Sequence, residues 1–213
     1  NCMKINTEYC ESPVASYDVV KTMRASFYVL GPFMSRFGKA EVSLPGGCAW
    51  GPRPIDFHIQ ALKELGAKIK LSNGMIISSG KLKGKTINFK KSSVGATGNI
   101  IMASVTADGE TIINNAAQEP EIEDLCNFLV KTGADITGIG SSLIRINGRK
   151  KLHADIEHII IPDRIEAGTF LIAAASTKSN LVINNSSPSH LKIVLEMLIK
   201  SGMGIEIQNN KIK

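Results

Sequence analysis

One short stretch of the sequence combines a reactive side chain, glycines and an arginine. Cys48 follows two glycines, and Arg53 lies a few residues further along, after Gly51 and Pro52. Glycine lets the main chain approach a ligand closely, and a nearby guanidinium stabilises a thiolate. Such a thiol can serve as a general acid or a nucleophile. The alternative is an irregular surface loop with an incidental thiol, because a single cysteine needs a partner group to react.

Two predicted elements hold the Cys48 loop in place. Apolar residues alternate at Ala40 and Val42 before the loop, which predicts a strand. Ile59 and Leu62 follow it at helical spacing, which predicts an amphipathic helix. The loop is therefore a strand-to-helix connection, as its prolines and glycines also indicate.

A second stretch has a chemistry of its own. Residues 93–97 (SVGAT) open a predicted helix that runs over residues 96–107. A helix N-terminus with small side chains presents free N–H groups to an anion. We therefore expect an anion site at this helix start.

The chain repeats itself with a period of about 70 residues, which defines its structural unit. Three predicted helices each end in glycine and lead into a strand, at Gly66, Gly133 and Gly202. Upstream of them, small-residue helices over 24–37, 96–107 and 165–176 each precede a strand, predicted in 39–45, 109–115 and 179–185. The unit is thus helix, strand, helix and further strands, which is an α/β fold class.

The repeats differ where the first strand joins the second helix. This spacing is longest in the first copy, over residues 42–66, against 112–133 and 182–202 in the others. The additional residues fall in the loop that contains Cys48. Residues that a repeat does not need for its core favour a functional role for the loop.

Composition excludes several classes of protein. The net charge of +6 suits an anionic ligand, but few aromatic residues accompany the basic ones and no nucleic-acid motif is present. We therefore expect a phosphorylated small molecule and no nucleic acid. No apolar run could span a membrane and no signal-peptide pattern is present, so we expect no membrane partner. The four cysteines lack metal-ligand spacing, which predicts free thiols in a reducing cytoplasm and no metal site.

Five motifs in a fixed order carry a family resemblance. They are YDVVKTMRAS at 17–26, LPGGCAWGPRPIDFH at 44–58, SVGAT at 93–97, NAAQEPEI at 115–122 and PDRIEAGT at 162–169. Together they resemble the UDP-N-acetylglucosamine enolpyruvyl transferases. The resemblance implies transfer of the enolpyruvyl group of phosphoenolpyruvate to the 3-hydroxyl of UDP-N-acetylglucosamine, the start of peptidoglycan synthesis, without a cofactor. It also implies an inside-out α/β arrangement of repeats in two domains.

The resemblance assigns roles at the phosphoenolpyruvate side. Cys48 matches the family cysteine that acts as the general acid toward the methylene carbon of phosphoenolpyruvate. The same cysteine is the site that fosfomycin alkylates. Arg53 and Arg24 match anion-binding arginines, whose planar guanidinium groups offer paired donors to phosphate and carboxylate. The alternative for each arginine is a surface salt bridge.

The resemblance also assigns the nucleotide-sugar side. The segment that holds the uracil matches Pro54, Ile55, Asp56 and Phe57, and the diphosphate site matches Lys91, Ser93, Val94 and Gly95.

Other roles stay open in this sequence. Asp56 could instead be the N-cap of the helix that follows. His58 could bind the ligand or pack in the core. Glu119 and Glu121 could line the cleft or cap the next helix, and we favour the cap.

The family pattern also divides the chain. Residues 1–162 match most of one domain, and residues 163–213 match the first repeat of the other. A family Lys-Asn pair matches positions before this sequence, and a later Asp and Arg match positions beyond it. We therefore expect the isolated chain not to turn over. The alternative is a non-catalytic remnant that keeps the fold and nucleotide-sugar affinity, and the oligomeric state stays open.

Overall fold

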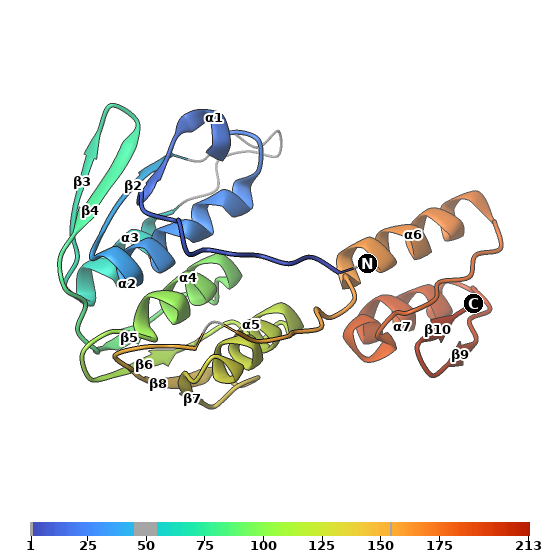
Figure 1. Ribbon diagram of the computed structural model, residues 1–213. Helices are drawn as coiled ribbons and strands as arrows, with labels where there is room; N and C mark the ends of the chain where they lie inside the picture. The colour runs from blue at the N-terminus through green and yellow to red at the C-terminus, as the bar shows by residue number, and fades with distance from the viewer. Residues whose placement is uncertain (1, 45–54, 154) are drawn as a thin grey trace. The chain divides into compact units, whose positions relative to one another are not determined.

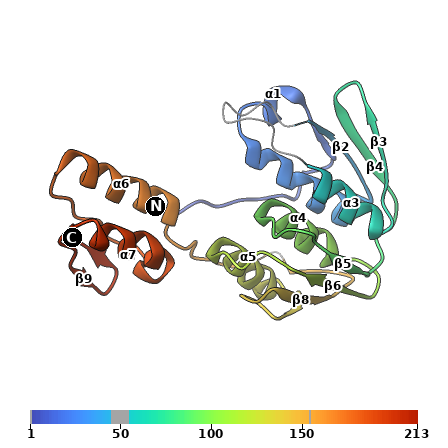
Figure 2. The same ribbon diagram turned by 180° about the vertical axis from the view of Figure 1, so that it is seen from behind.

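The computed structural model describes residues 2–44, 55–153 and 155–213. The chain divides into two compact units, Asn1–Ile156 and Glu157–Lys213 (Figures 1 and 2). Each unit has its own apolar core. The predicted domains, divided at residue 162, stay a prediction. In the part of the chain that the structure describes, no helix combines the length and the apolar character that crossing a membrane requires.

The first repeat of the larger unit forms a four-stranded sheet with helices on one face. Its elements are β1 (Val14–Ala15), α1 (Tyr17–Val20), the 3₁₀ helix η1 (Arg24–Val29), α2 (Leu30–Phe37), β2 (Lys39–Ser43), α3 (Asp56–Glu64), β3 (Lys68–Ser72) and β4 (Met75–Ser79). The strand order is β1-β2-β4-β3, with β1 parallel to β2 and the other pairs antiparallel. Ala40 and Val42 are buried while Lys39 and Glu41 are exposed, as strand alternation predicts.

The second repeat has the same topology. Its elements are β5 (Thr86–Asn88), α4 (Val94–Ser104), β6 (Glu110–Asn114), α5 (Pro120–Lys131), β7 (Asp135–Thr137) and β8 (Leu143–Asn147). The order β5-β6-β8-β7 again combines one parallel pair with two antiparallel pairs. Two successive segments thus fold into one pattern, as their sequence similarity predicts.

The smaller unit holds the third copy. It contains α6 (Arg164–Thr177), the 3₁₀ helix η2 (Pro188–Leu191), α7 (Lys192–Lys200), β9 (Ile207–Gln208) and β10 (Lys211–Ile212). The strand predicted in residues 179–185 is wrong, because only Ile183 pairs there, in an isolated bridge with Ile212. Its counterpart β6 lies between β5 and β8, whereas Ile183 has a ladder partner on one side only within the described residues.

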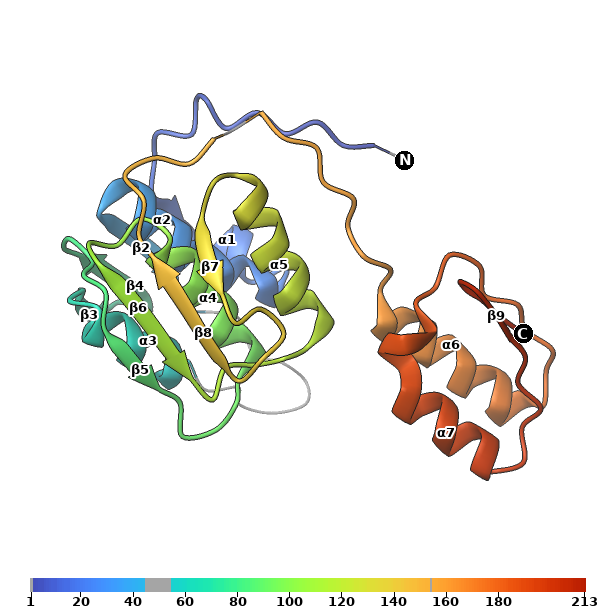
Figure 3. The same ribbon diagram turned by 90° about the horizontal axis from the view of Figure 1, so that it is seen from below.

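The helices of the larger unit gather between its two sheets, with α4 among α2, α3 and α5 (Figure 3). Ile100 and Ile101 of α4 are fully buried, and so are Val42 of β2 and Ile113 of β6. Helices inside and sheets outside agree with the predicted α/β fold class, which is confirmed.

All three predicted glycine helix ends are confirmed. Gly66, Gly133 and Gly202 have φ values of 100°, 95° and 95°. The N–H of each glycine donates to the carbonyl three residues earlier in the chain. The N–H of the next residue donates to the carbonyl five residues earlier, as from Ala67 to Leu62. This is the Schellman arrangement, which glycine adopts without the steric cost of a Cβ.

The helix predicted over residues 24–37 is broken near its middle. Residues Arg24–Val29 form η1, and the α-helix begins only at Leu30. Pro32 has no N–H to continue the ladder, and the N–H of Gly31 bonds to Oδ1 of Asn99 instead of a helix carbonyl. A side chain from the next repeat therefore replaces a helical hydrogen bond.

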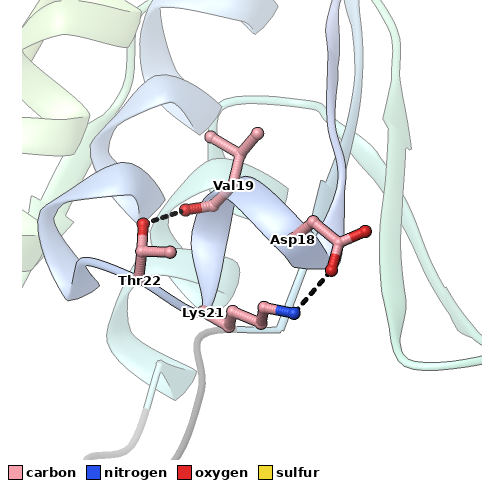
Figure 4. A network of polar contacts seen from close by, with 4 residues as sticks. All are labelled: Asp18, Val19, Lys21 and Thr22. Carbon is pink, nitrogen blue, oxygen red and sulfur yellow. Dashed lines mark hydrogen bonds and ion pairs between the residues drawn. The ribbon is translucent and has the colours of Figure 1, made fainter.

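A short turn leads into η1 and is held by local contacts (Figure 4). Lys21 Nζ lies 2.6 Å from Asp18 Oδ1, and Thr22 Oγ1 donates to the carbonyl of Val19 at 2.8 Å. These groups are exposed, so the ion pair contributes little to stability.

Candidate functional site

The central predicted residues lie outside the part of the chain that the structure describes. Cys48, Arg53 and Pro54 fall within residues 45–54, which connect β2 to α3. Arg24 opens η1 with its main chain, and its side chain also lies outside the described part. The roles of these residues stay predictions.

The start of α3 places the uracil-side residues. Ile55 is the N-cap, and the exposed Asp56 is the first helical residue, so the alternative of Asp56 as N-cap is wrong. The ring of Phe57 packs against that of Phe89, with centroids 6.3 Å apart. His58 is buried. The first turn of α3 thus sends its second and third residues inward and leaves a carboxylate at the surface.

The sequence predicts an anion site at the start of α4. Ser93 is the N-cap, and its hydroxyl accepts from the N–H of Ala96 at 3.3 Å. A helix leaves its first N–H groups without helical partners, here those of Val94 and Gly95, which are only half-buried. No acidic residue lies in this first turn. Lys91 is exposed just before it, so the local charge favours an anion.

Tertiary structure brings these two helix starts together. The Cε1–Nε2 edge of the His58 ring lies so close to Gly95 that a Cβ there would be 3.2 Å from both atoms. The other ring nitrogen, Nδ1, lies 3.1 Å from Nδ2 of Asn99, one turn further along α4. Residues 55–58 and 93–95 therefore form one continuous region on the larger unit.

A small hollow lies beside this region. It is lined by residues of α3 and by the end of β5 with the residues after it: Phe57, Gln60, Ala61, Glu64, Ile87, Asn88, Phe89 and Lys90. Its volume of about 10 Å³ holds no more than about one water molecule. The hollow is therefore too small for a nucleotide sugar.

The described thiols differ in environment. Cys2, Cys10 and Cys126 are free, with Cys2 and Cys10 exposed and Cys126 buried on α5. Burial, together with the negative charge of Glu123, raises the pKa of the Cys126 thiol to about 12. Cys126 is therefore protonated at neutral pH and suits packing, not catalysis.

The start of α5 corrects one expectation. Glu119 occupies the N-cap position, but its side chain makes no capping hydrogen bond. Its extended backbone is followed by Pro120, which needs no N–H partner at the first helical position. The favoured cap by Glu119 is therefore confirmed for its position but not for a side-chain hydrogen bond, and Glu121 lies in the first turn.

Sequence reasoning missed Asn99. Its amide is fully buried and bonds to Gly31, Phe27 and His58. The available signal was an amide side chain inside the apolar stretch of α4, where an unpaired polar group would be costly.

Comparison with known proteins identifies the family. The family model for EPSP synthase (3-phosphoshikimate 1-carboxyvinyltransferase) matches residues 3–213. A UDP-N-acetylglucosamine 1-carboxyvinyltransferase of Chlorobium luteolum is 51% identical over 216 residues, covering 100% of this chain and 50% of the relative. The same-named protein of Campylobacter hominis is 49% identical and is covered to 51%. The chain thus spans about half the length of these curated relatives, and the family resemblance of its motifs is confirmed.

Solved structures agree in fold. The enolpyruvyl transferase NikO of Streptomyces tendae matches 92% of this chain with a TM-score of 0.75 at 20% identity, and 48% of that chain is covered. An EPSP synthase of Acinetobacter baumannii matches 88% of this chain with a TM-score of 0.59 at 22% identity, and 44% of that chain is covered. Matched by its family model along nearly its whole length, the chain belongs to the EPSP synthase family of enolpyruvyl transferases.

Proposed function

We propose that this chain is part of a transferase that moves the enolpyruvyl group of phosphoenolpyruvate to the 3-hydroxyl of UDP-N-acetylglucosamine and releases phosphate. The names of relatives near 50% identity support this acceptor. The structural observation that carries the proposal is the contact of His58 with Gly95, which joins the starts of α3 and α4. By their chemistry, these starts suit the two ends of a nucleoside diphosphate.

The nucleotide subsite follows from these helix starts. The N–H groups at Val94 and Gly95 and the nearby Lys91 would hold the diphosphate, with Ser93 shaping the turn. Ile55, Asp56 and Phe57, with Pro54 before them, would contact the uracil, where Asp56 offers an exposed carboxylate to ring N–H groups. The diphosphate would thus lie at one helix start and the base at the other.

The reacting end would be supplied by the Cys48 loop. Protonation of the methylene carbon by Cys48 would make the neighbouring carbon electrophilic, so that the sugar oxygen bonds to it while the hydroxyl proton passes to a base. Loss of the added proton and cleavage of the carbon–oxygen bond to phosphate would then restore the double bond. Arg53 and Arg24 would stabilise the carboxylate and phosphate charges. The product would enter peptidoglycan synthesis in the bacterial cytoplasm, and Cys48 would be the site of fosfomycin alkylation.

A second acceptor has one specific observation in its favour, because the matching family model is described as 3-phosphoshikimate 1-carboxyvinyltransferase. Titration calorimetry of the 213-residue chain with UDP-N-acetylglucosamine and with shikimate 3-phosphate separates the two acceptors. We expect binding of the nucleotide sugar alone. Binding of shikimate 3-phosphate alone, equal binding of both, or binding of neither would contradict the proposal.

A matched pair of arginine variants tests the role of the loop in this binding. Charge-assisted hydrogen bonds contribute about 1.5–3 kcal/mol, so Arg53→Ala should weaken nucleotide-sugar binding about tenfold or more. Arg149→Ala removes an equal charge elsewhere, where Arg149 pairs with Asp135 at 2.8 Å. Equal effects of both changes would mean that only the general positive charge of the chain matters.

A further inference from the structure

Asn99 makes three polar contacts from the middle of α4, and each reaches a different element. Its Oδ1 lies 2.6 Å from the N–H of Gly31 in α2. Its Nδ2 lies 3.2 Å from the carbonyl oxygen of Phe27 in η1 and 3.1 Å from Nδ1 of His58 in α3. Asn99 is fully buried and His58 is 6% exposed. One amide therefore links α4 to three other elements, of which η1 and α3 carry predicted site residues in their first turns, as α4 itself does.

Two main-chain groups determine which way this amide is turned. The N–H of Gly31 can only donate, so the Asn99 atom facing it is the oxygen. The carbonyl of Phe27 can only accept, so the atom facing it is the NH₂ nitrogen. The exchange of oxygen and nitrogen would bring two donors together at Gly31 and two acceptors together at Phe27. The orientation of the Asn99 amide is thus determined, because a main-chain N–H cannot accept and a main-chain carbonyl cannot donate.

This orientation in turn determines the state of His58. One hydrogen of the Asn99 NH₂ group goes to Phe27, and the other points at Nδ1 of His58. Nδ1 must then be an acceptor without a proton, so a neutral ring carries its proton on Nε2. A doubly protonated ring would set an N–H group against the NH₂ group in a buried site.

The packing around the two side chains holds this geometry. The ring of Phe27 meets the ring of His58 edge to face, with centroids 5.1 Å apart and an angle of 80° between the planes. A Cβ at position 31 would collide with the main-chain oxygen and Oδ1 of Asn99, so Gly31 is required for the contact. Gly95 likewise leaves the space that the Cε1–Nε2 edge of His58 occupies.

From this arrangement we infer that Asn99 is a positioning residue, which holds His58 as its Nε2–H tautomer with that edge against the first turn of α4. The Nε2–H group then lies on the side of the His58 ring that faces Gly95. Its use toward the diphosphate of a nucleotide sugar rests on the proposed function. The tautomer of His58 does not rest on the proposed function.

Long-range ¹H–¹⁵N correlation spectra of the histidine rings in the 213-residue chain test the tautomer directly near neutral pH. The spectrum of His58→Gln identifies the His58 signals by their loss. We expect an unprotonated Nδ1 and a protonated Nε2 in the unsubstituted chain. A protonated Nδ1 would overturn the inference, whatever the ligand.

The variant Asn99→Asp tests the cause. It keeps an acceptor for Gly31 at nearly the same size but cannot donate, so we expect His58 to become protonated at Nδ1. Binding of UDP-N-acetylglucosamine should weaken about tenfold or more. An unchanged tautomer in this variant would contradict the positioning role. If the variant does not fold, the tautomer of the unsubstituted chain still decides.

Thr97→Val is the matched control. Thr97 is also fully buried in α4, and its hydroxyl accepts from the N–H of Ala117 at 3.0 Å. Its loss should reduce stability but leave the His58 tautomer and ligand binding unchanged. Equal loss of binding in both variants would mean that Asn99 has only a structural role. The expected tautomer without any binding of the nucleotide sugar by the unsubstituted chain would refute the proposed function and leave the Asn99–His58 arrangement standing.

Discussion

Helices α4 and α6 hold the same place in successive repeats, about 70 residues apart, yet their surroundings differ. Helix α4 packs against α2, α3 and α5, and Ile100 is fully buried. Helix α6 packs against η2 and α7, and Phe170, at the position matching Ile100, is 56% exposed. The repeat pattern therefore specifies an apolar helix, but the number of neighbouring layers decides how much of it is buried.

The two helix starts differ as well. Helix α4 is capped by the neutral Ser93 and has no acidic residue in its first turn. Helix α6 is capped by Asp163, whose carboxylate accepts from the N–H groups of Ile165 and Glu166, and Glu166 adds another negative charge. A carboxylate thus already occupies the position at α6 that an anionic ligand would take. This difference favours α4 as the ligand-binding helix start.

The largest expected effect concerns the closed interior around α4. Cys126 lies on the neighbouring α5 with a pKa raised to about 12. Against an ordinary thiol at 9.0, its thiolate population falls about a thousandfold, so alkylation by iodoacetamide should be slower than at the exposed Cys2 and Cys10 by at least that factor. Mass mapping after brief labelling measures the rates, and we expect Cys48 to react fastest. Labelling of Cys126 as fast as Cys2 would show that the interior opens readily.

The raised pKa of Cys126 also predicts that the stability of the folded chain depends on pH. The protonated thiol is favoured in the folded state, so its contribution to stability is present below about pH 9 and is lost as pH rises toward about 12. The hydroxyl in Cys126→Ser does not ionise in this range. The free energy of unfolding of this variant, measured in urea, should therefore not show this loss between about pH 9 and about pH 12. Parallel pH profiles of the two proteins would contradict the burial of Cys126.

A pair of truncations compares the two helices directly. Ile100→Ala should cost about 2–5 kcal/mol, because it opens a cavity in a closed core. Phe170→Ala should change stability by less than about 0.5 kcal/mol, because more than half of that side chain is exposed. Urea unfolding followed through amide signals of each unit measures both. Similar costs would show that α6 is as well packed as α4.

The smallest expected effect separates helix capping from ligand binding. Ser93→Asp keeps a good N-cap, so stability should change by less than about 0.5 kcal/mol, but a carboxylate now lies where the diphosphate would bind. Nucleotide-sugar affinity should fall about tenfold. The reverse exchange at α6, Asp163→Ser, should leave affinity unchanged. Calorimetry measures the affinity and thermal unfolding the stability of both variants. Equal affinities of Ser93→Asp and the unsubstituted chain would reject the start of α4 as the binding site.

Sequence patterns predicted much of this fold because the relevant signals are local. Glycines end three helices through main-chain geometry that each glycine determines alone, and Ser93 marks the start of α4 through its own hydrogen bond. The interruption of the helix at Leu30 could not be predicted in this way. It depends on Asn99, 68 residues from Gly31, which takes over the N–H of Gly31.

The site was predictable in parts but not as a whole. Motifs identified residues 55–58 and 93–95 separately, whereas their contact through His58 and Gly95 arises only when α3 packs on α4. The third repeat shows the same limit. Its strand pattern at residues 179–185 is as apolar as that of β6, but a strand forms only where neighbouring strands supply hydrogen bonds on its edges.

We propose that a nucleotide sugar binds at the start of α4 and not at the matching start of α6. A ¹H–¹⁵N amide titration of the 213-residue chain with UDP-N-acetylglucosamine tests it most directly. We expect the largest shifts at the amides of Phe57, Val94 and Gly95, and none at Arg164 and Ile165. Shifts centred on Arg164 and Ile165, or no shifts at a saturating concentration, would contradict it.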